Sequence, residues 1–151
     1  MIRLSKDAFF INLCVSLSTQ GTCCRRQTGC VIINKYYEIM STGYNGPPSG
    51  YTHCERHGWT CNGANYPSGQ GLSECEAIHA EANALLKCTD IHSIHTLYCT
   101  ASPCFDCIKL ISNTSCKRIV FLEPYTGCNR SEEFFCRHDK TREWVHYVAK
   151  S

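Results

Sequence analysis

The sequence contains no long apolar run. A membrane-spanning helix needs about 20 consecutive apolar residues, and no stretch of the chain approaches that length. An apolar stretch within residues 1–18 is interrupted by Lys6, Asp7 and Asn12, which argues against the continuous hydrophobic region of a signal peptide. We therefore expect a cytoplasmic protein with no membrane partner.

The chain also has little excess of either positive or negative charge. The chain has 15 Lys and Arg against 13 Asp and Glu, a net charge of +2. It contains no run of roughly five or six like charges, so neither a basic surface nor a nucleic-acid partner is expected. Internal repeats, low-complexity tracts and linker-like segments are absent too. With 43% hydrophobic and 19% charged residues, the 151 residues have the composition of one globular domain, 1–151.

Cysteine, by contrast, is abundant, with 14 residues. In a short secreted chain this density would indicate a disulfide framework. Here Cys14, Cys30, Cys88 and Cys99 lie inside apolar segments, where reduced thiols act as small buried hydrophobic groups. Other cysteines gather with histidines in polar loops, which indicates metal binding. We predict reduced thiols and metal ligands rather than disulfides.

Short β-rich runs alternate with segments of good helix formers, which favours an α/β layered domain with a mixed sheet. Ser5 is expected to cap the first helix and Gly21 to end it. Residues 45–75 are rich in Gly, Pro and Asn, and a loop of that length in a compact domain is usually functional. The expected elements are helix 5–20, a hairpin of strands 29–34 and 38–44, helix 79–88, strand 94–100, helix 104–113, strand 117–122 and helix 131–138.

The stretch from His79 to Cys107 carries the clearest chemistry. His79, Cys104 and Cys107 supply one imidazole and two thiolates, which leave the fourth position of a tetrahedral zinc open for water, as in catalytic sites. Glu81 is not needed as a ligand and is free to move a proton. This H-x-E…P-C-x-x-C pattern is the signature of zinc deaminases that act on cytosine or adenine.

Each residue type in this pattern has a chemical reason. Zinc lowers the pKa of a bound water to around 7, and one carboxylate can deliver the protons that loss of an amine requires. Cys104 and Cys107 are expected on one face of a helix's first turn, where the helix N-terminus favours thiolate. A lone His at a helix start is more often a cap, and a lone C-x-x-C can be a redox pair or half of a structural zinc site. Neither alternative explains why Glu81 accompanies His79.

Further motifs make the chain resemble the deoxycytidylate (dCMP) deaminases of the cytidine deaminase-like superfamily. The resemblance spans roughly residues 5–125. It rests on Cys23-x-Arg25-Arg26-x-x-Gly29, on T-G-Y-N-G at 42–46 followed by Pro48 and Gly50, on H-A-E at 79–81, and on S-P-C-x-x-C at 102–107. The segment after about residue 126 departs from the family pattern.

The resemblance implies a three-layer α/β/α fold with a central five-stranded mixed sheet. It implies zinc-dependent hydrolysis of dCMP at C4 to dUMP and ammonia, which supplies the dTMP precursor. Asn45 would contact the deoxyribose and Glu81 would face the pyrimidine edge beside the zinc. Arg26 and Tyr125 are candidates for the phosphate, whereas Arg25 is either a further candidate or a solvated side chain.

The family resemblance also concerns assembly and regulation. Many members are homohexamers that dCTP activates and dTTP inhibits, at a regulatory site near the T-G-Y-N-G loop. Mg²⁺ can accompany such a nucleoside triphosphate effector. These properties are therefore expectations for this chain.

A second, structural zinc site is expected around the long loop, where Cys and His residues cluster. Similar proteins often carry a Cys at the position of Cys23 and another just upstream of H-A-E. A closed site would supply folding energy to this loop. Ordinary buried or exposed thiols are the alternative. The expected ligands are Cys23, Cys54, Cys61 and Cys75, with His57 as the main replacement.

Two other functions remain open. A polynucleotide cytidine deaminase would accept a base from a single strand, but the chain lacks a basic stripe. A non-enzymatic zinc module would use the cysteines for structure or partner binding. Such a module has no need of Glu81.

Overall fold

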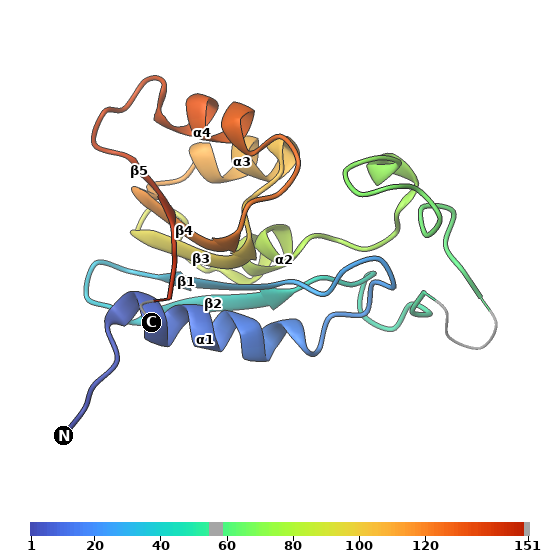
Figure 1. Cartoon of the computed structure of the whole chain (residues 1–151), viewed down its shortest axis with the longest axis horizontal. Coiled ribbons are helices and arrows are strands. Elements are labelled where there is room, and N and C mark those ends of the chain that lie inside the picture. The colour runs from blue at the N-terminus through green and yellow to red at the C-terminus, as the bar shows by residue number, and fades with distance from the viewer. Residues whose placement is uncertain (55–58, 150–151) are drawn as a thin grey trace.

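The computed structural model describes residues 1–54 and 59–149, in which one five-stranded sheet lies between two layers of helices (Figure 1). The expected three-layer α/β/α fold with a mixed sheet is confirmed. The elements in chain order are α1 (Lys6–Ser18), β1 (Gly29–Ile33), β2 (Ile39–Tyr44), the 3₁₀ helix η1 (Leu72–Glu74), α2 (Ala80–Lys87), β3 (Thr96–Ala101), α3 (Phe105–Ser112), β4 (Arg118–Glu123), α4 (Cys128–Cys136) and β5 (Glu143–His146).

The strand order is β2-β1-β3-β4-β5. β1 pairs antiparallel with both β2 and β3, which confirms the predicted hairpin, whereas β3, β4 and β5 run parallel to one another. β1 is buried along its whole length and β3 is buried at all but one position, as expected for central strands covered on both faces. The parallel half of the sheet brings the carboxyl ends of β3 and β4 to one edge.

Helix α1 covers one face of the sheet. Ser5 caps it by accepting a hydrogen bond from the Ala8 N–H at 3.1 Å, as predicted, and the helix ends at Ser18 with Thr19 as its C-cap. Its buried side chains pack against β1, β3 and β4. They are Phe10, Ile11 and Cys14, which meet Val31, Ile33, Tyr98 and Val120.

Helices α2, α3 and α4 cover the opposite face (Figure 1). Ala80 and Ala84 of α2 are fully buried, and α2 lies close to β2 because Gly43 has no side chain. A Cβ on Gly43 would overlap the backbone of Ala80 and Ala84. The glycine within the T-G-Y-N-G motif therefore has a packing role beneath α2.

The structure differs from the sequence-based expectation mainly near the C-terminus. Helix α4 begins at Cys128, ahead of the expected 131, and β5 adds a parallel edge strand that local sequence pattern did not reveal. All 14 cysteines lie in the described part of the chain as free thiols. No helix among the described residues combines the length and apolar character needed to cross a membrane.

The segment between β2 and α2 extends away from the sheet (Figure 1). Its described residues contain η1, and an isolated bridge of Gly46 with Ile78 returns the chain to the start of α2. Most of the expected long loop is therefore irregular, and its later part reaches the cavity described next.

Candidate active site

The starts of α2 and α3 meet beside the carboxyl end of β3. His79 is the N-cap residue of α2 and Cys104 is the N-cap residue of α3, and both have extended backbone. Cys107 lies in the first turn of α3, which places both thiols where the helix N-terminus favours negative charge. The H-A-E and P-C-x-x-C motifs thus place three possible metal ligands close together.

The three donors form a compact cluster. His79 Nδ1 lies 3.4 Å from the Sγ atoms of both Cys104 and Cys107. All three donor atoms lie within 4.8 Å of one another, and this is the one such group of three or more among residues 1–54 and 59–149. Nitrogen and sulfur ligands of a tetrahedral zinc lie about 3.5 Å apart at the usual bond lengths. The donor set and its spacing therefore fit zinc.

The charges of the cluster suit a cation as well. A hydrogen bond from Cys107, reinforced by His79, lowers the pKa of Cys104 to about 4. The hydrogen bond with Cys104, together with burial, raises the pKa of Cys107, and the bond to Cys104 raises that of His79. The buried donors thus share protons that a divalent cation would displace.

Glu81 lies beside this cluster in the first turn of α2 and is only 5% exposed. Burial raises its pKa, while the nearby His79 and Cys107 act in the opposite direction. A buried carboxyl group with a raised pKa is suited to accept a proton and to return it. The geometry places this group next to the donors without making it one of them.

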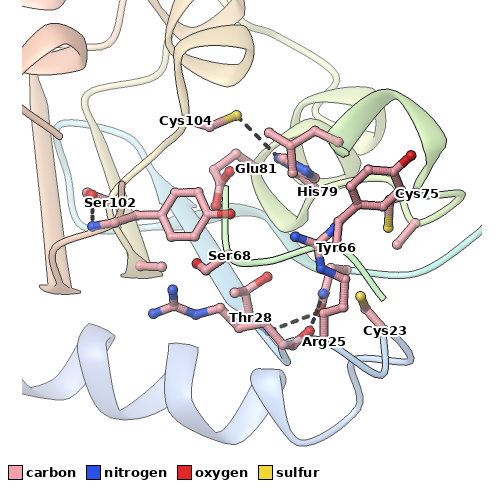
Figure 2. A pocket seen from close by; sticks show the side chains of 16 residues that line it. Cys23, Arg25, Thr28, Tyr66, Ser68, Cys75, His79, Glu81, Ser102 and Cys104 are labelled. Carbon is pink, nitrogen blue, oxygen red and sulfur yellow. Dashed lines mark hydrogen bonds between the residues drawn. The ribbon is translucent and has the colours of Figure 1, made fainter. Parts of the chain in front are cut away.

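A cavity of about 300 Å³ opens over these residues. Figure 2 shows Glu81 and His79 beside Cys104 at one side of it, with Arg25 and Thr28 on the opposite wall. The cavity brings all three substrate-contact candidates, Arg26, Asn45 and Tyr125, together with the His-Cys cluster. Its remaining lining residues are Cys23, Tyr66, Ser68, Leu72, Cys75, Ala77, Ala101 and Ser102.

Arg26 and Tyr125 lie together at this cavity. The Arg26 guanidinium lies 5.2 Å from the centroid of the Tyr125 ring, and its Nη2 donates to Glu123 Oε2 at 2.9 Å. The backbone N–H of Tyr125 donates to Ser102 Oγ at 2.7 Å, which fixes the start of the segment after β4. The two residues that were predicted from distant parts of the sequence thus form one cationic, aromatic corner.

Asn45 is buried, and its amide group already has protein partners. Its Oδ1 accepts from the Thr28 N–H at 2.9 Å, and its Nδ2 donates to the Arg26 carbonyl at 2.6 Å. The side chain therefore positions the backbone that carries Arg26, in addition to lining the cavity. Sequence reasoning had assigned it only a sugar contact.

The cysteines expected to form a second zinc site surround a separate small cavity. Cys23, Cys54, Cys61 and Cys75 all line it, but their sulfur atoms do not form a group as compact as the His-Cys-Cys cluster within the described residues. Cys24, which sequence reasoning overlooked, has its Sγ 3.1 Å from Cys54 Sγ. His57 lies outside the described residues.

Sequence reasoning also missed part of the cavity wall. Ser102 directly precedes the P-C-x-x-C motif, so its position next to the site could have been inferred. Tyr66 and Ser68 come from an irregular segment and Leu72 begins the short helix η1, and no local signal in the sequence identifies them as lining residues.

Comparisons with known proteins show which proteins the chain resembles. The chain is 35% identical to the deoxycytidylate deaminase of Mycobacterium phage D29 over 127 residues, which cover 80% of this chain and 97% of that protein. It is 33% identical to the deoxycytidylate deaminase of Saccharomyces cerevisiae over 127 residues, 83% of this chain. The aligned part makes up only 40% of the yeast protein.

A solved structure shares the fold. The dCMP deaminase of cyanophage S-TIM5, in complex with dCMP and dUMP, matches with a TM-score of 0.71 and 24% identity, over 97% of this chain and 100% of that one. The family model for the cytidine and deoxycytidylate deaminase zinc-binding region matches residues 4–123. The chain therefore belongs to the cytidine and deoxycytidylate deaminase family.

Proposed function

We propose that this protein is a zinc-dependent dCMP deaminase that hydrolyses dCMP to dUMP and ammonia. The observation that carries the proposal is the position of Glu81, buried beside the His79, Cys104 and Cys107 donors in a cavity that Arg26 and Tyr125 also line. Relatives named deoxycytidylate deaminase support the choice of substrate. Such an enzyme would act in the cytoplasm on a free nucleotide.

His79, Cys104 and Cys107 would hold the metal. When bound there, zinc supplies a water molecule with a pKa near 7. Glu81 would accept one proton from the water that attacks C4 of the cytosine ring and would pass it to the ring nitrogen. The same carboxylate would then accept the second proton, from the hydroxyl group left on C4, and would pass it to the leaving amine, a shuttle that its raised pKa favours.

The other lining residues of the cavity would form a nucleotide site. Cavities of about 300 Å³ and larger hold small-molecule ligands, and this one reaches that volume. Arg26 would bind the phosphate while stacked on Tyr125, since Glu123 accepts from only one of its guanidinium nitrogens. Asn45 retains an unused lone pair and N–H through which the deoxyribose could bind.

Further properties are proposed from family membership. A second zinc would draw together Cys23, Cys54, Cys61 and Cys75 and order the loop that carries them. We also propose that the protein forms a homohexamer. In this assembly dCTP would activate the enzyme and dTTP would inhibit it, with Mg²⁺ accompanying the bound triphosphate.

The first experiment compares dCMP with deoxycytidine by the loss of cytosine absorbance. The zinc-loaded chain should turn over dCMP with a clearly higher kcat/KM, and Arg26→Gln should abolish this preference. Equal rates for both substrates would place the chain among nucleoside deaminases and discard the phosphate contacts. Absence of turnover with either would favour a polynucleotide substrate or a structural zinc module.

A further inference from the structure

The segment from Cys61 to Leu72 forms one wall of the cavity. Tyr66, Ser68 and Leu72 line the cavity from this segment, and Figure 2 shows Tyr66 and Ser68 among its lining side chains. Backbone hydrogen bonds within it are those of successive turns, from the N–H groups of Ala64, Tyr66 and Gln70 to the carbonyls of Cys61, Gly63 and Pro67. Apart from Leu72, which begins η1, this segment contains no helix or strand, so contacts to the rest of the chain must hold it.

Arg25 supplies two such contacts. Its Nη1 donates to the Gly63 carbonyl at 3.1 Å, and its Nη2 donates to the Pro67 carbonyl at 2.7 Å. Hydrogen bonds from a guanidinium are stronger than those between neutral groups, and its planar fork can hold two acceptors at once. Arg25, in the connection between α1 and β1, thus binds the wall segment at two positions, Gly63 and Pro67.

The far side of the wall is packed closely. Gly71, with φ of +63°, lies against the Tyr66 ring so tightly that a Cβ there would overlap it. A Cβ on Gly69 would lie 3.1 Å from the Thr126 side chain, next to Tyr125. The segment therefore packs against itself at Gly71 and lies close to Thr126 at Gly69, whereas Arg25 supplies its hydrogen bonds to the α1–β1 connection.

We infer that Arg25 is a positioning residue for this site, which clamps segment 61–72 in place as the wall that encloses the base and sugar of the bound cytosine nucleotide. This inference rests on the proposed function. Arg25 and Arg26 are neighbours with different contacts. Arg26 pairs with Glu123 and is the proposed phosphate ligand, whereas both terminal nitrogens of Arg25 donate to backbone carbonyls. Arg25 therefore affects substrate binding by positioning segment 61–72 and does not itself bind the phosphate.

The kinetic test uses Arg25→Gln and Arg25→Lys in the zinc-loaded chain, with dCMP and deoxycytidine as substrates. Arg25→Gln should raise KM for both substrates by the same factor, on the order of ten-fold, with a smaller effect on kcat. Arg25→Lys should show a smaller increase, because an ammonium group lacks the fork. Arg26→Gln is the matched comparison and should affect dCMP alone. A loss confined to dCMP in Arg25→Gln would make Arg25 a phosphate ligand and overturn the clamp.

A second measurement does not depend on activity. Amide hydrogen exchange over residues 61–75 should accelerate in Arg25→Gln and remain unchanged in Arg26→Gln and in the surface variant Lys35→Gln. Unchanged exchange in Arg25→Gln would overturn the clamp. If the native chain failed to deaminate dCMP, the proposed function would fall, and the exchange result would still decide the role of Arg25.

Discussion

The side-chain amide of Asn45 donates to the backbone carbonyl of Arg26 at 2.6 Å. The oxygen of the same amide accepts a hydrogen bond from the Thr28 N–H. Asn45, which directly follows the hairpin, therefore holds the backbone on both sides of Gln27. Asn45 belongs to the T-G-Y-N-G motif, and Arg26 lies in the segment that precedes β1. One side chain thus joins the two sequence motifs that set this chain apart from deaminases in general.

Replacement of Asn45 should therefore reduce stability as well as substrate binding. Asn45→Ala leaves two backbone groups without their partner, and we expect the free energy of unfolding to fall by about 2 kcal/mol. Asn45→Asp keeps the acceptor for Thr28 but buries a carboxylate against the Arg26 carbonyl, so its loss should be at least as large. Urea denaturation and KM for dCMP measure the two effects, with the exposed Asn12→Ala as control. Unchanged stability in Asn45→Ala would limit the residue to a substrate contact.

Glu81→Gln should separate metal binding from catalysis. Glutamine preserves the shape of the side chain but cannot shuttle a proton, so kcat should fall by roughly 10²–10⁴-fold. The zinc content, measured by atomic absorption, should stay at the native value because Glu81 is not a donor. Native turnover in this variant would rule out the mechanism proposed above.

The contact between α1 and β4 should depend on pH. Arg118 donates to both carboxylate oxygens of Asp7 at 2.7 Å, and this interaction lowers the pKa of Asp7 below its usual 3.8. A lowered folded-state pKa means that the stabilisation is present above pH 3.8 and is lost as the pH falls through the folded-state value. Asp7→Asn should cost about 2 kcal/mol at neutral pH, and its cost should shrink in acid.

Chemical denaturation of native and Asp7→Asn protein, at neutral pH and below pH 3.8, measures this difference. The exposed pair of Glu133 and Arg137 provides the control, since Glu133→Gln should change stability little at either pH. An Asp7→Asn penalty of equal size in acid and at neutral pH would contradict the assignment.

Metal analysis should distinguish two zinc sites. We expect two zinc ions per native chain and one in Cys61→Ser, together with a lower unfolding temperature because the loop loses its metal. Cys104→Ser should also bind one fewer zinc but should lose turnover entirely. A native content of one zinc ion would make the proposed structural site wrong and leave the thiols around the small cavity as ordinary packing groups.

The sequence by itself determined the elements with strong local patterns. The hairpin of β1 and β2, the cap of α1 at Ser5 and the helices that follow His79 and Pro103 were predicted correctly, because side-chain period and capping act within a few residues. The same locality brought Cys104 and Cys107 together, since residues three apart share one side of a helical turn. The family fold followed from motifs at these element ends.

Tertiary structure decided what joins distant segments. Arg26 and Glu123 are separated by 97 residues in the sequence. Arg25 lies 38 residues before Gly63 and 42 residues before Pro67, whose carbonyls it binds. Local sequence carries no period or cap that encodes such contacts, because they depend on the order of strands in the sheet and on where an irregular loop returns. For the same reason β5, the pairing of Cys24 with Cys54 and the cavity wall around Tyr66 became visible only in the folded chain.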